Sequence, residues 1–232
     1  MALLNLACGT TVEKDWVNVD WSPFAFLAKR RLVALGLRTM GFLNDTRWQR
    51  LGELNADVIR HDVRKRLPLG ESSFDAVYHS HFLEHLSPRR ARSFTAECRR
   101  VLKEGGIIRV VVPDWAYYAR IYCSAANVSA KQEAIHQAIH QFMDHEEDDS
   151  SPLRVRLADK LFRMTSVGNG YKHRWMYDGD TLKAFLVDNG FKDPHMARFD
   201  ESAIQNWASY HLDVNYDGSV RRPDSVFVEA WK

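Results

Sequence analysis

The sequence predicts an α/β domain built on a mostly parallel β-sheet. Short apolar runs recur with helical stretches between them, which is the pattern of parallel strands joined by crossover helices. The chain has 232 residues, 45% of them hydrophobic, so it is long enough to bury one full core. Several apolar runs also end in small or acidic residues, as strands do at the ligand-binding edge of an open sheet. We therefore expect a single domain over residues 1–232.

Apolar runs in the first half of the chain predict five strands, which we expect to be buried and central in the sheet. Two further strands are expected near the C-terminal end of the sequence. The predicted ranges are 2–7, 16–20, 56–60, 74–79, 107–112, 196–200 and 225–231.

Two predicted helices have clear boundary signals. The first starts at Ser87 as N-cap, with Pro88 in its first turn, and stops at Gly105. The second begins near Asp178 and ends at Asn189-Gly190. Both positions suit connections that lead into predicted strands.

Two segments, 21–55 and 115–175, do not fit the minimal alternation of strands and helices. Both follow predicted strands at their carboxyl ends, which is the edge where open α/β sheets bind ligands. We expect insertions there that form a lid or a substrate-binding surface.

Charge and cysteine content argue against several classes of protein. Lys and Arg number 32 against 30 Asp and Glu, and a formal charge of +2 cannot supply the broad positive field that nonspecific nucleic-acid binding needs. Three cysteines, Cys8, Cys98 and Cys123, form no CxxC pair, and their odd number favours reduced thiols in the cytoplasm. We expect neither a signal peptide nor a membrane-spanning segment.

Small or acidic residues follow three of the predicted strands. The first strand runs into a turn of small residues containing Gly9, where backbone can approach a ligand closely. The second strand ends at Asp20, which can accept hydrogen bonds from ribose hydroxyls, and the third is followed by Asp62, which can accept from the amine of adenine. Because these strand ends share one sheet edge, they predict a single nucleoside site.

Four motifs follow one another along the chain. Residues 5–9 form the turn, 16–20 read Trp-Val-Asn-Val-Asp, 73–85 combine Ser-Phe-Asp with Leu-Glu-His, and 100–106 read Arg-Val-Leu-Lys-Glu-Gly-Gly. This order resembles class I methyltransferases that depend on S-adenosylmethionine (SAM), especially a small methyltransferase-11-like subgroup associated with polysaccharides. The resemblance covers most of the chain outside the two insertions.

The resemblance implies a Rossmann-like sheet of seven strands in the order 3-2-1-4-5-7-6, with strand 7 antiparallel, helices on both faces and a helical lid insertion. It also implies SAM as cofactor, bound across the first and fourth strands. The implied cofactor residues, carried over by position, are Ala7 and Gly9 for the methionine part, Asp20 for the ribose, Asp62 and Val63 for the adenine, Trp21 stacked on adenine, and His79 near the methionine part.

Three positions depart from the wider pattern of this class. Ala7 stands in place of the first glycine, Thr11 in place of a third, and Asn5 in place of the usual acidic residue. Only residues 10–15 separate the first two strands, too few for a full crossover helix. A helix dipole at the cofactor turn is therefore not expected.

Methyl transfer from a sulfonium is an in-line displacement, so alignment dominates its barrier. An alcohol acceptor also needs a base, because a neutral hydroxyl is a poor nucleophile. We expect a histidine in this role: His145 first, because acidic residues flank it, then His173 and His81. A divalent metal on the acidic run around His145 is an alternative, but a solvated loop is the simpler interpretation, and no metal site is assigned.

Trp115, Tyr118, Arg174 and Trp175 are the expected acceptor-binding residues, because aromatic rings suit a sugar ring or an apolar small molecule. Methylation of a sugar or oligosaccharide hydroxyl is the leading prediction, by family analogy. Alternatives are O- or N-methylation of a small natural product, a non-catalytic SAM-binding module, and an NAD-dependent oxidoreductase, whose G-x-G-x-x-G helix start this chain lacks. We expect a monomer or homodimer.

Overall fold

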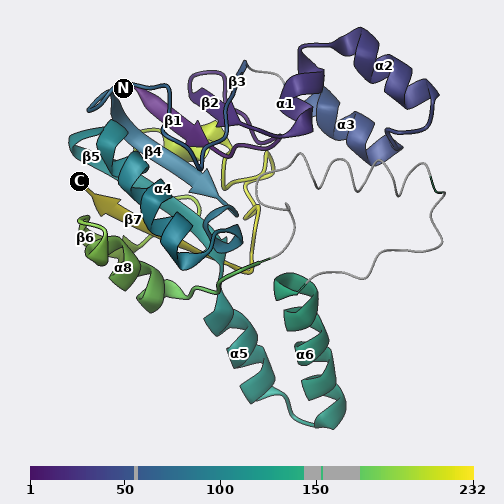
Figure 1. Ribbon diagram of the computed structural model, residues 1–232. Coiled ribbons are helices and arrows are strands. Elements are labelled where there is room, and N and C mark those ends of the chain that lie inside the picture. The colour runs from purple at the N-terminus through teal and green to yellow at the C-terminus, as the bar shows by residue number, and fades with distance from the viewer. Residues whose placement is uncertain (55–56, 144–152, 154–172) are drawn as a thin grey trace.

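A seven-stranded sheet forms the centre of the computed structural model, which describes residues 1–54, 57–143, 153 and 173–232 (Figure 1). The strand order is β3-β2-β1-β4-β5-β7-β6, which confirms the predicted topology. Strands β1 to β5 pair in parallel, whereas β7 runs antiparallel to both of its neighbours. The strands are β1 (Leu3–Leu6), β2 (Val17–Asp20), β3 (Val58–Arg60), β4 (Phe74–Ser80), β5 (Leu102–Pro113), β6 (Lys192–Met196) and β7 (Ser225–Trp231).

Two asparagines hold the short connection between β1 and β2. The buried Asn5 amide donates to the Thr11 carbonyl at 2.9 Å and to Asn18 Oδ1 at 3.0 Å. The Asn18 amide in turn donates to the carbonyls of Glu13 and Trp16, at 2.8 and 2.9 Å. These bonds let residues 7–16 join two parallel strands without a crossover helix. A carboxylate at position 5 could not donate either bond, which gives a structural reason for the asparagine.

Helices α4 (Pro88–Val101) and α8 (Gly179–Asp188) cover one face of the sheet (Figure 1). Their apolar sides join the largest core cluster through Phe94, Leu182 and Leu186. The predicted start of α8 is confirmed, because Asp178 and Thr181 form a capping box there.

The expected end of α4 at Gly105 is wrong. The helix stops at Val101, and Leu102 takes extended backbone angles and pairs with Phe74 in the sheet. At the other end, Ser87 occupies the N-cap position with Pro88 after it, as predicted, although the Ser87 side chain makes no capping bond.

Residues 197–224, the C-terminal irregular segment, pack on the opposite face of the sheet through Ile204, Trp207 and Leu212. The described helix of this segment is the short 3-10 turn η2 (Trp207–Tyr210). The predicted strand 196–200 is wrong, because β6 ends at Met196. The fully buried Arg109 explains the difference: its Nη2 donates to the carbonyls of Arg198 and Phe199, at 2.7 and 3.5 Å. These carbonyls face the guanidinium instead of a neighbouring strand.

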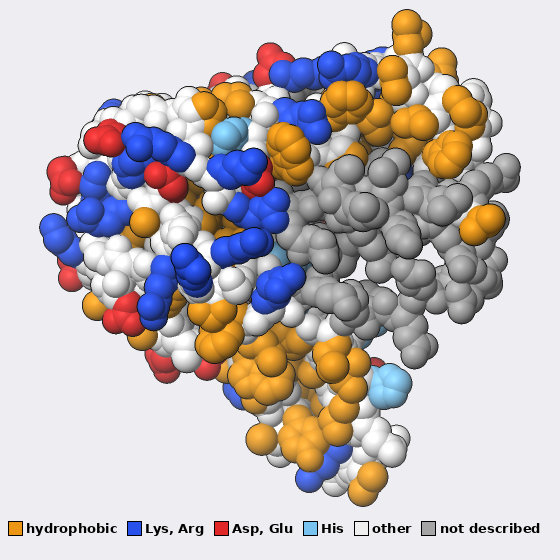
Figure 2. Space-filling model, viewed as in Figure 1, with side chains coloured by type: hydrophobic (Ala, Val, Ile, Leu, Met, Phe, Trp, Pro, Cys, Tyr) orange, Lys and Arg blue, Asp and Glu red, His pale blue; other side chains and the backbone are white. Residues whose placement is uncertain are grey.

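Both expected insertions are helical where the structure describes them. The first contains α1 (Pro23–Ala28), α2 (Arg31–Thr39) and α3 (Asp45–Glu53), which share a small apolar core beside β3. The second contains α5 (Trp115–Ser124) and α6 (Val128–Phe142), a helical hairpin that projects from the end of β5 (Figure 1). Hydrophobic side chains gather on the face of this hairpin that Figure 2 shows. Among the described helices, each is too short or too polar to cross a membrane.

Candidate active site

A pocket of about 470 Å³ opens at the carboxyl ends of β1 and β4. Its floor includes the turn after β1, and its walls include side chains from the end of β4 and the C-terminal irregular segment. Three cationic side chains also line it, Arg50, Arg221 and Arg222. The pocket therefore lies where ligands bind in open α/β sheets, and its walls are polar.

The turn after β1 has an unusual backbone that opens it to a ligand. Ala7 and Gly9 both have left-handed backbone angles, with φ of 53° and 55°. A Cβ atom at Gly9 would meet nothing within 4 Å, so this residue faces open space in the pocket. Only glycine adopts these angles without strain, so Gly9 is favoured by conformation and not by lack of room.

Asp20 ties this turn to the start of the first insertion. Its buried carboxylate accepts hydrogen bonds from the backbone N–H of Gly9, at 2.9 Å to Oδ2, and of Ser22 at Oδ1. A carboxylate offers about four lone-pair sites, so these two bonds leave capacity for a ligand hydroxyl. Asp20 thus lies directly beside the turn, as the sequence predicted.

The predicted adenine-binding residues lie on the neighbouring strand end. The Asp62 carboxylate is held by the Arg64 guanidinium, with Nε–Oδ1 and Nη2–Oδ2 distances of 2.8 and 2.9 Å. Burial alone would raise the pKa of Asp62, but the hydrogen bonds from Arg64 outweigh it and hold this pKa below its usual value. Val63 is buried in the core, and the guanidinium of Arg60 lies 4.3 Å from the centre of the Trp21 ring.

The structure places His79 away from the pocket. Its ring is fully buried and packs edge-on against Phe94 of α4, with 5.0 Å between ring centres. Neither ring nitrogen has a hydrogen-bond partner among the described residues, and burial lowers the pKa of His79 to about 3. Side chains alternate along a strand, so Tyr78 and Ser80 reach the pocket while His79 points to the opposite face.

His81 is the predicted base that lines the pocket. It has a left-handed φ of 51°, and its Nε2 shares a hydrogen bond of 2.9 Å with Ser225 Oγ. Burial, together with the positive charge of Arg222, lowers the pKa of His81 to about 3, so its ring is neutral at pH 7. His145, the first candidate from the sequence, lies outside the described residues.

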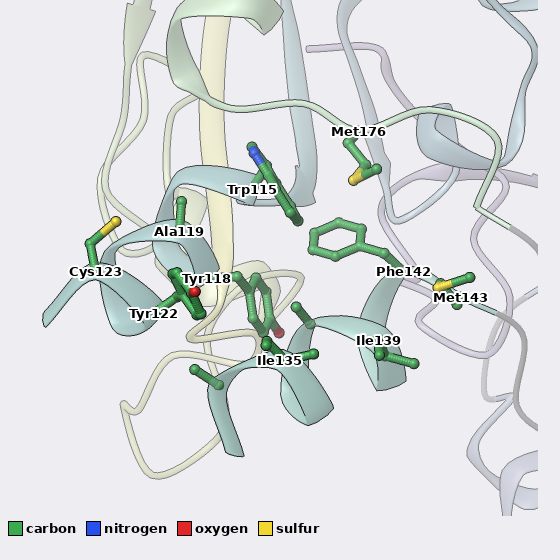
Figure 3. Close-up of a pocket in the computed structure, with 12 residues that line it drawn as sticks. Trp115, Tyr118, Ala119, Tyr122, Cys123, Ile135, Ile139, Phe142, Met143 and Met176 are labelled. Atoms are coloured by element: carbon green, nitrogen blue, oxygen red, sulfur yellow. The ribbon is translucent and has the colours of Figure 1, made fainter. Parts of the chain in front are cut away.

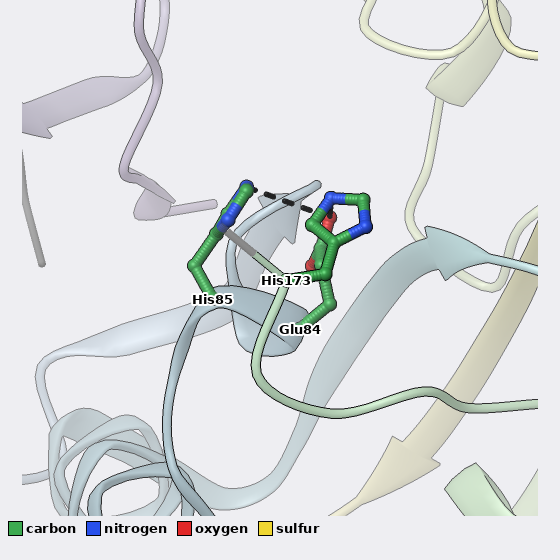
Figure 4. A group of neighbouring side chains, drawn as sticks. All are labelled: Glu84, His85 and His173. Atoms are coloured by element: carbon green, nitrogen blue, oxygen red, sulfur yellow. Dashed lines mark ion pairs between the residues drawn. The ribbon is translucent and has the colours of Figure 1, made fainter. Parts of the chain in front are cut away.

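Behind His81 lies a buried carboxylate, Glu84, on the short 3-10 helix η1 (Leu83–His85). Its Oε1 is 3.9 Å from the Nε2 atoms of both His85 and His173, which Figure 4 shows beside it. The same oxygen is 3.6 Å from His81 Nδ1. Burial raises the pKa of Glu84 to about 8 and lowers that of His173 to about 4. Neither Glu84 nor His85 is among the site residues that the sequence predicts, although the Leu-Glu-His motif contains both.

The four predicted acceptor residues fall into two groups. The backbone N–H groups of Arg174 and Trp175 both donate to the Glu84 carbonyl, at 2.7 and 3.1 Å, beside the histidines. Trp115 and Tyr118 instead line an apolar groove of about 440 Å³ between α5 and α6 (Figure 3). The ring of Phe142 connects the groups, since it lies 5.4 Å from Trp115 and 5.8 Å from His173.

One family model matches part of this chain. The family described as "Methyltransferase domain" matches residues 30–110, about a third of the 232 residues. The matched range contains β3, β4 and α4 but begins after the turn and Asp20. Among curated proteins, no sequence matches the chain.

Several solved structures are similar over the whole chain. A SAM-dependent methyltransferase from Archaeoglobus fulgidus is 16% identical with a TM-score of 0.47, and the match covers 100% of this chain and 86% of that one. One from Methanosarcina mazei is 13% identical with the same TM-score, covering 100% and 92%. The SAM-dependent methyltransferase SibL is 13% identical at a TM-score of 0.46, and the match covers 100% of this chain but 50% of SibL.

The strand order of the sheet, with its antiparallel β7, is the one that the resemblance to class I SAM-dependent methyltransferases implies, and the family match to residues 30–110 agrees with this resemblance. The pocket fits this cofactor: its volume lies within the range of roughly 300 to 1,000 Å³ that small-molecule sites have, its floor is the left-handed turn, and a buried carboxylate adjoins that turn.

Proposed function

We propose that the protein is a SAM-dependent methyltransferase that methylates a hydroxyl group of a sugar or oligosaccharide. The observation that carries the proposal is the polar pocket, in which His81 and three arginines share the walls with the turn after β1. A polar acceptor can exchange its water hydrogen bonds for bonds to such walls, whereas an apolar acceptor cannot. When bound, SAM supplies an electrophilic methyl group on its sulfonium.

The cofactor residues keep the roles that the sequence predicted, with one exception. Ala7 and Gly9 would hold the methionine part and Asp20 the ribose hydroxyls. Asp62, Val63 and Trp21 would bound the adenine; the support for Asp62 is that the His61 N–H donates to the Asp20 carbonyl at 3.1 Å, so the two strand ends are adjacent. His79 is withdrawn from the methionine part because its ring packs on Phe94.

We assign the base role to His81. The acceptor hydroxyl must lose its proton as the new O–C bond forms, and a positioned histidine accelerates such steps by about 10² to 10⁴. His81 lines the pocket and its ring is neutral at pH 7, so a ring nitrogen can accept this proton. His173 is the second candidate, since its Nε2 lies 3.9 Å from Glu84 Oε1, the oxygen that is 3.6 Å from His81 Nδ1.

A small apolar natural product is the second candidate acceptor, and the observation that favours it is the groove between α5 and α6. Trp115 is 41% exposed there and offers a ring face to an apolar ligand. Arg174 and Trp175 would contact either acceptor, because their backbone is bonded to Glu84 beside His81.

The free cysteines support a reducing compartment, which we propose to be the cytoplasm, where the protein would act as a monomer or homodimer. Product release is the direct test of function. Purified protein would be incubated with SAM and a panel of saccharides, phenols and amines, and the methylated product identified by mass spectrometry. We expect O-methylation of a saccharide. Turnover of phenols alone would favour the natural-product candidate, and SAM binding without product release would indicate a non-catalytic module.

A further inference from the structure

A second group of side chains lies beside the cofactor pocket. Glu84 and His85 come from η1, and His173 comes from a segment far along the chain (Figure 4). One ligand atom from each, a carboxylate oxygen or an imidazole nitrogen, lies within 4.8 Å of the other two. We call these three residues the Glu84 cluster.

The carboxyl group of Glu84 is the unusual member of the cluster. The residue is 1% exposed, and neither carboxylate oxygen has a hydrogen-bond partner among the described residues. Buried polar atoms without partners are rare in native proteins, and a bound ion is one of the few things that satisfies them. Burying a carboxylate without compensation costs several kcal/mol. A bound cation would therefore supply the partner that this carboxylate lacks among the described residues.

The histidines provide nitrogen ligands on the same side of this carboxylate. The Nε2 atoms of His85 and His173 are each 3.9 Å from Glu84 Oε1, and the two rings lie 4.7 Å apart between centres. A tetrahedral ion with bonds of about 2.0 to 2.2 Å separates its ligand atoms by about 3.4 Å. Side-chain movements of less than roughly an ångström would close the difference.

The backbone already holds the two segments together. The Glu84 carbonyl accepts hydrogen bonds from the N–H groups of Arg174 and Trp175, at 2.7 and 3.1 Å. His173 is the residue immediately before them, so its position relative to Glu84 is fixed by main-chain bonds. A site whose ligands are prearranged in this way loses little conformational entropy when an ion binds.

We propose that Glu84, His85 and His173 bind a divalent transition-metal ion, with Zn²⁺ as the expected occupant. Two imidazole nitrogens and one carboxylate oxygen are the ligand set of many zinc and iron sites, whereas Mg²⁺ and Ca²⁺ prefer oxygen ligands alone. This site differs from the acidic run around His145 that the sequence suggested as an alternative.

Three protein ligands leave a fourth position open on a tetrahedral ion. His81 lies between the cluster and the cofactor pocket, with its Nδ1 3.6 Å from Glu84 Oε1. An acceptor hydroxyl bound at the open position would be acidified by the ion, and that use of the site rests on the proposed O-methylation. With His173 as a ligand, the base role remains with His81.

Metal binding to the full chain tests the site without SAM or any acceptor. Protein stripped with EDTA would be titrated with ZnCl₂ by calorimetry and with CoCl₂ by visible absorption. We expect one ion per chain, and at least a ~10-fold loss of affinity in His85→Asn and in His173→Asn, since losing even an outer-shell partner has an effect of this size. Glu84→Gln should lose affinity to the same extent or more.

His136→Asn on α6 is the matched control, because His136 is exposed and remote from the cluster in sequence, and its affinity should equal that of the unmodified protein. Zinc should also raise the melting temperature of the unmodified protein but not that of His85→Asn. The melting transition measured without zinc shows whether each variant is folded. A protein that binds no zinc, or that binds it equally well in both histidine variants, would overturn the proposal. Neither result decides whether the protein is an O-methyltransferase, which the product assay tests separately.

Discussion

The polar pocket at the ends of β1 and β4 and the apolar groove between α5 and α6 have nearly the same volume, about 470 and 440 Å³, but they are built differently. Backbone geometry and buried polar groups shape the pocket: a left-handed turn, the Asp20 carboxylate and the Asn5 amide. The groove is shaped by side-chain packing between two helices. A site defined by directed hydrogen bonds suits a ligand with fixed polar groups, and a groove of aromatic and aliphatic side chains tolerates different apolar shapes.

The largest effect is expected in the groove. Phe142→Ala removes a buried ring that packs on Trp115, Tyr118 and His173, and such truncations cost about 3 to 5 kcal/mol. We expect faster amide hydrogen exchange throughout α5 and α6, with SAM affinity unchanged. Met143→Ala, an exposed neighbour, should exchange normally. Weakened SAM binding in Phe142→Ala would show that groove and pocket are one structural unit.

The second largest effect is expected at His79, whose substitution should change how much stability the protein loses in acid. The folded-state pKa of His79 is about 3 against 6.5 for the free side chain, so the unfolded chain takes up a proton first as pH falls below 6.5. Each pH unit between 6.5 and 4 then removes about 1.4 kcal/mol of stability. Between pH 6.5 and 4, the free energy of unfolding of His79→Leu should fall by about 3 kcal/mol less than that of the unmodified protein, as measured by urea unfolding. The control His136→Leu should follow the unmodified curve, and an identical acid loss in His79→Leu would contradict the buried, neutral ring.

Asp20→Ala tests the proposed contact between Asp20 and the ribose of SAM. It removes the acceptor that holds the Gly9 N–H and that we assign to the ribose. SAM affinity should fall more than ~10-fold, equivalent to about 1.4 kcal/mol or more, in calorimetry. Asp15→Ala provides the comparison, because Asp15 is exposed in the loop before β2, and its affinity should not change. Equal affinities in the two variants would remove Asp20 from the cofactor site.

Tyr118→Phe is expected to have the smallest effect. The Tyr118 hydroxyl donates to Asp224 Oδ2 at 2.6 Å and joins α5 to the loop before β7. Its loss should lower the free energy of unfolding by about 1 kcal/mol without changing SAM binding. Tyr117→Phe, on the exposed side of the same helix, should be neutral. A larger loss in Tyr117→Phe than in Tyr118→Phe would reverse the assignment of which tyrosine supports the hairpin.

Local pattern was sufficient for most of the fold. Strands β1, β2, β4 and β7 are apolar runs, and the start of α8 has its own capping residues, so neighbouring residues decide these elements. The end of β6 was predicted wrongly because Arg109, distant in sequence, binds the carbonyls of Arg198 and Phe199. Long-range bonds of this kind leave no periodic signal.

The residues of the candidate site also differ in whether neighbouring or distant parts of the chain determine their positions. Ala7, Gly9 and Asp20 lie together because each ends or follows a strand, and the family resemblance implies that these strands are neighbours. The period of two along β4 puts Tyr78 and Ser80 on the pocket side, so this alternation already argues against a cofactor contact by His79. The Glu84 cluster was not predictable, because the partner of Glu84 is brought to it by a segment from another region of the chain.

The main-chain carbonyl group of Glu84 connects several elements of the structure. The main-chain oxygen of Glu84 receives two consecutive amides, and a few residues later the same strip of chain bonds to Trp115 at the root of the hairpin and then enters α8. Main-chain hydrogen bonds thus connect η1 to residues 174–175 and, two residues further on, to the first residue of α5. The α5–α6 hairpin and α8 therefore share one main-chain attachment next to the candidate site.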